Sequence, residues 1–215
     1  MTATTIHLVR HGEVENPDHV VYASLPGFGL SSRGRSQAAA AGERLGRRRV
    51  TMVVSSPLQR ARQTAEIVAS SVQSAVSTDE RLLEWQLGEL WAGTRWNELD
   101  IRFPGQLDAY LDHPQDLDFS PESLDRLARR VAALVEEIAS ANGGKEAVIV
   151  SHQDPIQAGR LHLTGRPLAG LQSDKPAHCS VVTLSREAGE QAWSESSYWE
   201  PDQGTAFPPI RVEGH

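Results

Sequence analysis

Three short stretches of the sequence share one arrangement, in which an apolar run ends at a group of polar side chains. They are Leu8-Val9-Arg10-His11-Gly12, Val53-Val54-Ser55-Ser56-Pro57-Leu58-Gln59-Arg60 and Val148-Ile149-Val150-Ser151-His152. Arginine side chains bind phosphate oxygens in a bidentate way, and two arginines with two histidines in one crevice would make a cationic pocket. The residue types therefore point to a phosphate-binding site.

The elements that must position these residues can be predicted from hydrophobic pattern and from capping residues. Strands are expected over 6–9, 50–55, 72–78, 147–151, 180–184 and 192–197, and helices from Ser31 or Ser32 to 46, over 57–71, over 120–141 and over 155–164. Ser56 and Pro57 are predicted to be the N-cap and first residue of the second helix.

Because strands alternate with helices, the pattern predicts an α/β fold with a mainly parallel sheet. The carboxyl ends of parallel strands line a common crevice, so we expect Arg10, His11, Arg60 and His152 to converge there. The free N–H groups of a helix that starts near Ser56 would add affinity for an anion. The tail from Pro201 is predicted to be irregular.

Length and composition exclude several classes of protein. The 215 residues carry a formal net charge of −7, which argues against a general nucleic-acid binder. No run approaches the roughly 18 apolar residues of a membrane helix, and no secretory signal or zinc-binding spacing is seen. A single cysteine, Cys179, fits a reducing compartment, so we expect a cytoplasmic protein. Since no linker divides the chain, we predict one domain over residues 1–215.

Five ordered segments resemble the motifs of the histidine phosphatase superfamily, which includes the cofactor-dependent phosphoglycerate mutases. They are Leu8-Val9-Arg10-His11-Gly12-Glu13, Leu30 to Ala38, Ser55 to Ala65, Leu82-Leu83-Glu84 with the following Gly88 and Trp91-Ala92-Gly93, and Val148 to His152. The resemblance covers roughly residues 5–185. It implies a three-layer sandwich, phosphoglycerate mutase-like, in which helices flank the mainly parallel central sheet.

The resemblance also implies a role for each matching residue. His11 would be the nucleophile that accepts the phosphoryl group, and Glu84 the general acid that protonates the leaving oxygen and then activates water. Arg10, Arg60 and His152 would bind the phosphate, and His152 is counted among the catalytic residues. These groups neutralise charge without a metal, so no metal or other cofactor is expected.

Simple electrostatics favours this assignment for His11, because two guanidinium groups nearby should lower its pKa and leave a nitrogen unprotonated. The same cations should depress the pKa of Glu84, although an acid must be protonated. A bound phosphate dianion is one way to raise that pKa in the complex.

The sequence departs from the family pattern near both histidines. Val14 stands where the family usually has Thr, and Pro17 where it has a phosphate-contacting Asn. We therefore take Asn16 as a candidate phosphate ligand. Gln153 replaces a glycine after the second histidine, and its backbone N–H or side chain is a second candidate. His178 is interpreted as structural.

The length and charge of the segment between Glu84 and the long helix help to distinguish a phosphatase from a mutase. Residues 85–120 form a short excursion, expected over the active site, with Arg95 and Arg102 as its positive charges. Phosphoglycerate mutases of the superfamily typically carry a longer, more basic insertion. We therefore favour a metal-independent histidine acid-type phosphatase that hydrolyses a small phosphorylated metabolite through a phosphohistidine.

Two other functions stay open: a phosphoglycerate mutase-type transfer, and a phosphate-binding protein with a weakly active core. The expected partner is a small phosphorylated substrate, with no nucleic acid and no membrane. Trp193, Tyr198 and Trp199 are expected either to close the last edge of the fold or to form an oligomer contact, such as that of a homodimer.

Overall fold

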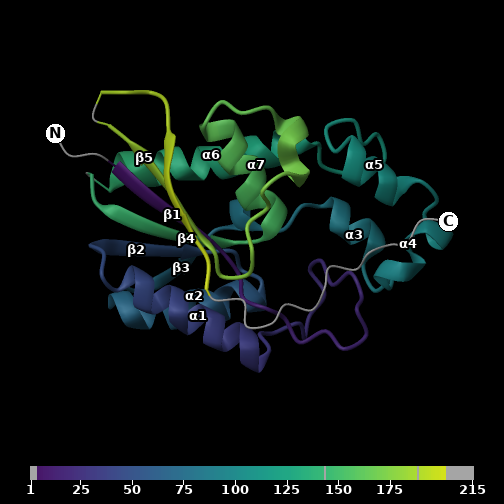
Figure 1. The fold of residues 1–215 in the computed structure, drawn as a ribbon, viewed down its shortest axis with the longest axis horizontal. Coiled ribbons are helices and arrows are strands. Elements are labelled where there is room, and N and C mark those ends of the chain that lie inside the picture. The colour runs from purple at the N-terminus through teal and green to yellow at the C-terminus, as the bar shows by residue number, and fades with distance from the viewer. Residues whose placement is uncertain (1–3, 143, 188, 202–215) are drawn as a thin grey trace.

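A six-stranded sheet forms the centre of the fold (Figure 1). The computed structural model describes residues 4–142, 144–187 and 189–201. The strand order is β3-β2-β4-β1-β5-β6. The strands are β1 (Thr4–Arg10), β2 (Val50–Ser55), β3 (Val76–Thr78), β4 (Glu146–Ser151), β5 (Val181–Arg186) and β6 (Ser194–Trp199). Strands β3, β2, β4 and β1 pair in parallel, whereas β5 pairs antiparallel with both β1 and β6. This pairing confirms the mainly parallel sheet.

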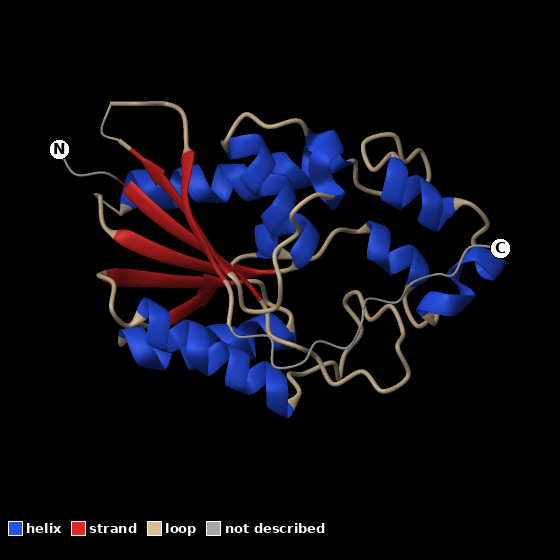
Figure 2. Cartoon of the chain, in the orientation of Figure 1, coloured by secondary structure: helices blue, strands red, loops and turns tan. Residues whose placement is uncertain are grey.

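Helices cover both faces of the sheet and complete the predicted three-layer arrangement (Figure 2). Helices α1 (Ser32–Leu45) and α2 (Gln59–Val72) pack together on one face, over a core that includes Val9, Val53 and Val150. Helices α6 (Leu124–Ala141) and α7 (Gln153–Leu163) lie on the other face, over Ile6, Leu8 and Ile149. Successive side chains of β1 thus point to opposite faces of the sheet and pack against different helix layers, as strand geometry requires.

The remaining short helices gather beyond the carboxyl edge of the sheet. The excursion after β3 contains η1 (Glu80–Leu82), α3 (Leu87–Trp91), η2 (Trp96–Glu98), α4 (Leu99–Arg102) and α5 (Gln106–Asp112), and η3 (Leu168–Gln172) follows α7. Trp85, Trp91 and Tyr110 are buried in a third apolar cluster with residues of α6 and α7. This packing holds the excursion against the body of the fold. Within the described residues, no helix is long and apolar enough to cross a membrane.

Capping side chains explain where two helices begin. Ser31 accepts a hydrogen bond from the N–H of Gly34 and caps α1, as predicted. Ser123 caps α6 in the same way, so this helix starts at Leu124 and the prediction of a start at Ser120 was wrong. The predicted N-cap at Ser56 was also wrong, because α2 starts at Gln59 with Leu58 in an extended conformation before it.

Two further boundaries differ from the sequence prediction. Helix α7 starts at Gln153, two residues before the predicted start at Pro155. Strand β3 is limited to Val76–Thr78, because α2 continues to Val72. The predicted late hairpin is confirmed as β5 and β6, although residue 188 in its turn lies outside the described residues, as do residues 202–215 of the tail. Trp193 lies just before β6 and is buried, whereas Tyr198, within β6, is exposed.

Two glycines let the loop after β1 cross the start of α1. A Cβ on Gly34 would collide with the carbonyl oxygen of Glu13, and one on Gly12 would lie 2.5 Å from the carbonyl oxygen of Gly34. The N–H of Ser31 donates to the Glu13 carbonyl at 3.0 Å, which fixes this crossing. Because His11 immediately precedes the crossing, its position depends on it.

We expect Gly34→Ala to destabilise the protein by about 1–3 kcal/mol, since the new methyl group meets backbone that cannot move aside. Alanine would otherwise stabilise a helix over glycine. Urea unfolding measures the change. Gly170→Ala is the matched control, because its Cβ would only make ordinary contact, 3.9 Å from a side-chain carbon of Leu161. A Gly34→Ala protein as stable as the wild type would contradict this account.

Candidate active site

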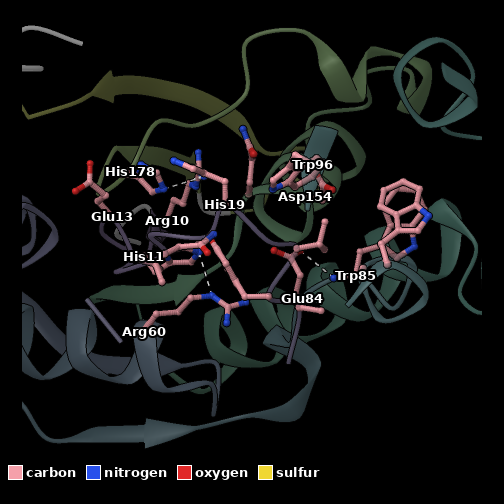
Figure 3. Close-up of a pocket in the computed structure, with 18 of the residues that line it drawn as sticks. Arg10, His11, Glu13, His19, Arg60, Glu84, Trp85, Trp96, Asp154 and His178 are labelled. Carbon is pink, nitrogen blue, oxygen red and sulfur yellow. Dashed lines mark hydrogen bonds between the residues drawn. The ribbon is translucent and has the colours of Figure 1, made fainter. Parts of the chain in front are cut away.

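The predicted residues meet at the carboxyl edge of the parallel strands. Arg10 ends β1, His11 follows it, and His152 follows β4, whose Ser151 carbonyl accepts from the N–H of His11 at 2.9 Å. Arg60 lies in the first turn of α2, next along the sheet. Arg10, His11, Arg60 and Glu84 line one cavity of about 780 Å³ (Figure 3). His152 is fully buried beside it, with its ring centroid 5.2 Å from that of His11.

The hydrogen bonds of His11 fix which ring nitrogen is free. Its Nδ1 lies 2.8 Å from the carbonyl oxygen of Gly12, which can only accept, so Nδ1 carries the proton. Its Nε2 accepts from Nε of Arg60 at 3.3 Å, so it holds a lone pair. Burial, followed by the charge of Arg60, keeps the pKa of His11 well below its usual value. The ring is therefore neutral at pH 7, with Nε2 as the available nucleophile.

The arginines are held by contacts that leave part of each guanidinium unused. Arg10 donates to the Pro176 carbonyl at 2.9 Å and to Nε2 of His178 at 3.0 Å. Arg60 is almost fully buried, and its guanidinium carbon lies 4.7 Å from the ring centre of Tyr22, a cation–π contact. Burial lowers the pKa of Arg60, which nonetheless stays charged.

His152 is oriented by the residue that the sequence interpretation took for a helix cap. Its Nε2 lies 2.8 Å from Oγ of Ser56, in the loop between β2 and α2. Its Nδ1 lies 4.0 Å from Oε2 of Glu84, a residue of the cavity lining. Burial and the charge of Arg60 keep the pKa of His152 well below its usual value, so this ring is also neutral.

Three buried nitrogen atoms around His11 have no hydrogen-bond partner. They are Nε of Arg10, Nη2 of Arg60 and Nδ1 of His152. A buried polar group without a partner costs free energy, so native structures rarely retain one without a reason. These atoms come from the residues expected to bind phosphate, and a tetrahedral oxyanion beside Nε2 of His11 would satisfy all three.

Glu84 is held in place through its backbone by a buried ion pair. Arg130 of α6 donates to the carbonyls of Arg81 at 2.6 Å and Glu84 at 3.1 Å. The same guanidinium pairs with Glu122 at 2.7 Å, and the Glu122 carbonyl accepts from the indole N–H of Trp85 at 2.8 Å. The carboxylate of Glu84 is thus presented to the cavity from a loop fixed on both sides.

The environment of Glu84 favours its protonated form. Burial, followed by the nearby charge of Asp154, raises the pKa of Glu84 to about 7, against the opposing effects of Arg60 and Arg10. The expectation that the cationic pocket would depress this pKa was wrong, because desolvation outweighs the arginines. A bound phosphate is not required to protonate Glu84 at neutral pH.

Asn16 and Gln153, the two other candidate phosphate ligands, both line the cavity, but they differ in whether their hydrogen-bonding groups are already used. Asn16 uses its side chain to hold its own loop: Nδ2 donates to the Val20 carbonyl at 2.9 Å, and Oδ1 accepts from the Val20 N–H at 3.1 Å. Gln153 is the first residue of α7, where its backbone N–H lies at a helix start. Gln153 is therefore better placed than Asn16 to contact an anion.

Sequence reasoning missed three residues of the site: His178, Tyr22 and Asp154. His178, which the sequence analysis interpreted as structural, lines the cavity with its ring centroid 5.7 Å from that of His11. Burial lowers its pKa to about 2, so it stays neutral and accepts from Arg10. Its position depends on the pairing of β5 with β1, which no local signal in the sequence indicates.

Asp154 belongs to a small polar cluster on the excursion side of the cavity. It lies 2.9 Å from Nζ of Lys175 and accepts from the hydroxyl of Tyr110 at 3.0 Å. The sequence signal that could have found it is its place, two residues after His152 at the start of a helix.

Together these groups suit transfer of a phosphoryl group. A neutral imidazole can attack phosphorus, buried guanidinium groups can stabilise charge on its equatorial oxygens, and a protonated carboxyl group can supply a proton to a leaving oxygen.

Comparisons with known proteins agree with this geometry. The sequence profile of the Histidine phosphatase superfamily (branch 1) matches residues 6–197. The chain is 32% identical to the glucosyl-3-phosphoglycerate phosphatase of Mycobacterium tuberculosis over 98% of its own length and 92% of that protein. It is 31% identical to phosphoserine phosphatase 1 of Hydrogenobacter thermophilus, over 77% of this chain and 79% of that one.

Solved structures resemble the fold over almost its whole length. A mycobacterial glucosyl-3-phosphoglycerate phosphatase in complex with VO3 has a TM-score of 0.79 at 27% identity, covering 92% of this chain and 99% of that one. Bacillus stearothermophilus YhfR has a TM-score of 0.80 at 26% identity, covering 90% and 95%. On the strength of the profile match and these relatives, the chain belongs to the histidine phosphatase superfamily.

Proposed function

We propose that the protein is a histidine acid-type phosphatase that hydrolyses a small phosphomonoester through a phosphohistidine at His11. The observation that carries the proposal is the set of unpartnered buried nitrogens of Arg10, Arg60 and His152 around the free Nε2 of His11. The relatives named phosphatases support it, since they share the family and most of the chain length.

In the first step, Nε2 of His11 attacks phosphorus while the bond from phosphorus to the leaving oxygen breaks. Glu84 gives its proton to that oxygen, and the alcohol departs. The Gly12 carbonyl accepts from Nδ1–H of His11 throughout and favours the charge that develops on the ring. Arg10, Arg60 and Nδ1–H of His152 bind the phosphoryl oxygens, with Nε2 of His152 accepting from the Ser56 hydroxyl.

In the second step, the Glu84 carboxylate takes a proton from water, whose oxygen attacks phosphorus as the bond to Nε2 breaks. Phosphate leaves, His11 is neutral again, and Glu84 is protonated for the next cycle. The guanidinium groups offset the charge of the transferred group and neutral His152 donates a hydrogen bond to it, so we propose that the reaction needs no metal ion.

His11→Ala should lower phosphate release by about three orders of magnitude or more, because the attacking nitrogen is lost. The assay measures inorganic phosphate from a panel of phosphomonoesters with a chelator present. His162→Ala is the control, since His162 is exposed on α7. Equal rates in His11→Ala and the wild type would contradict the proposed nucleophile.

The same panel separates the alternatives. A phosphoglycerate mutase would interconvert phosphoglycerates when primed with a bisphosphate and release little phosphate. A binding protein would hold phosphate esters in a fixed stoichiometry without turnover.

The pH dependence of kcat/KM tests Glu84. Because the acid must be protonated, kcat/KM should fall as the pH rises through about 7, the pKa of Glu84. The pKa of His11 is lowered, so its loss of activity should lie on the acid side, below pH 6.5.

Glu84→Gln should remove the alkaline fall and lower kcat/KM by about 10²–10⁴-fold for an alkyl phosphate. The loss should be smaller for 4-nitrophenyl phosphate, whose leaving oxygen needs no proton. Ionisation of the substrate affects wild type and variant alike, so the difference between the two profiles isolates Glu84. If the alkaline limb of the pH profile were unchanged in Glu84→Gln, Glu84 would not be the general acid.

A further inference from the structure

The cavity extends well past the phosphate-binding atoms, and its remaining wall must contact the leaving group. This wall is formed by residues of the excursion and of the loop after β1. In Figure 3, Trp85 and Trp96 lie toward the Glu84 side of the cavity, across from His178 and Glu13. Its composition differs from that of the phosphate end. An inference about the leaving group rests on the proposed function, because it asks which phosphomonoester the proposed phosphatase hydrolyses.

Positive charge is confined to the phosphate end of the cavity. Among the described residues that line it, Arg10 and Arg60 are the arginines, and there is no lysine. Behind the cavity wall, Nζ of Lys175 is bound by Asp154 at 2.9 Å and by the Tyr110 hydroxyl at 2.5 Å. It also lies over the Tyr110 ring at 4.7 Å, so its charge is already neutralised and its donors are committed.

Carboxylates line the cavity as well. Glu13 lies beside His178 at the phosphate end (Figure 3), where it accepts from the Ser31 hydroxyl at 2.7 Å and pairs with Arg33 at 3.4 Å. Glu15 is exposed on the same loop, and Asp154 lines the opposite side. Since Glu13 pairs with Arg33 and Asp154 with Lys175, Glu15 is the carboxylate of this lining whose charge a substrate carboxylate would meet. Beyond Arg10 and Arg60, no described lining residue offers such a substrate carboxylate a guanidinium or ammonium group.

Five aromatic side chains form a further part of the cavity lining. Trp85, Trp91 and Tyr110 are packed in the core of the excursion and present part of their surface to the cavity. Tyr22 stacks on Phe28 with ring centroids 5.3 Å apart, and Trp96 is 40% exposed at the cavity wall. These residues favour an apolar or ring-bearing group, which they can cover without a charge partner.

We infer that the physiological substrate is a phosphomonoester of an uncharged alcohol or phenol with an apolar or aromatic body, and that phosphoesters bearing a carboxylate are discriminated against. This class differs from phosphoserine and from glucosyl-3-phosphoglycerate, the substrates named for two relatives, both of which carry a carboxylate.

Two matched pairs of substrates test the inference. Glycerol 3-phosphate differs from 3-phosphoglycerate by a hydroxymethyl group in place of the carboxylate, and phenyl phosphate lacks the carboxylate of 4-carboxyphenyl phosphate. In each pair, kcat/KM from phosphate release should favour the uncharged member by about tenfold or more. A preference for the carboxylate-bearing member of both pairs would overturn the inference.

Charge reversal at the cavity wall should change this selectivity. In Glu15→Lys, the preference for glycerol 3-phosphate over 3-phosphoglycerate should narrow by about three- to fivefold at low salt, and by less at high salt. Glu190→Lys makes the same change in net charge on an exposed turn outside the cavity and should leave the ratio unchanged. A ratio that moves equally in both variants would contradict a local effect of the wall.

The aromatic part of the inference has its own variant. Trp96→Ala should lower kcat/KM for phenyl phosphate by about threefold or more, with a smaller effect on glycerol 3-phosphate, because one aromatic contact is lost. Equal losses on both substrates would show that Trp96 does not contact the leaving group.

Binding separates failure of this inference from failure of the proposed function. His11→Ala, or His11→Gln if the alanine variant does not fold, keeps the cavity wall but cannot turn over. Calorimetry should show tighter binding of the uncharged member of each pair. Absence of phosphate release with this binding order would overturn the proposed hydrolysis alone. The opposite binding order would overturn the inference about the leaving group, whether or not the wild type hydrolyses the esters.

Discussion

The site depends on two positive charges, that of half-buried Arg10 and that of buried Arg60, which have no carboxylate partner. Among the described residues, neither Arg10 nor Arg60 forms an ion pair within 4.0 Å, although Arg60 is only 1% exposed. Burying an unpaired charge is costly, and the fold offsets the cost only in part, through the Pro176 carbonyl, His178 and the face of Tyr22. The missing counter-charge is what a phosphate group would provide. Affinity for an anion is thus built into the folded state.

This charge distribution also sets the protonation states that the chemistry needs. Burial keeps the pKa values of His11, His152 and His178 low, and Arg60 or Arg10 adds to the effect at each ring, so three histidines can lie together without repelling one another. Glu84 lies at the other side of the cavity, where burial and Asp154 act in the opposite direction and raise the pKa of the carboxyl group. A neutral base and a neutral acid therefore coexist at the same pH, on either side of the phosphate position.

The sequence was sufficient for the parts of the site that follow from strand ends. Arg10, His11 and His152 each end or follow an apolar run, and parallel pairing of β1 with β4 brings them together. Helix starts were less reliable, because Ser56 resembles an N-cap but its hydroxyl is used by His152. A serine before a proline looks the same in either role.

The residues that could not be predicted depend on contacts between distant parts of the chain. His178 reaches Arg10 because β5 pairs antiparallel with β1, and the Cys179 N–H donates to the Arg10 carbonyl at 3.0 Å. The pKa direction of Glu84 was wrong for a similar reason. The charges of the arginines can be read from the sequence. The desolvation of Glu84 cannot, because it depends on how the excursion packs around the carboxyl group.

The residues proposed to bind phosphate and those proposed to contact the leaving group come from different parts of the fold. The proposed phosphate-binding atoms come from strand ends and the first turn of α2, which are fixed by the sheet and by two helix layers. Glu84 is intermediate: it sits in a loop, but the Arg130–Glu122 pair ties that loop to α6. The leaving-group wall comes from the loop after β1 and from the excursion, whose side chains can change without disturbing the sheet. Pro17 and Gln153, two departures from the family pattern, both line the cavity, so they fall where the proposed substrate would be contacted, whereas Arg10, His11, Arg60 and His152 follow the pattern.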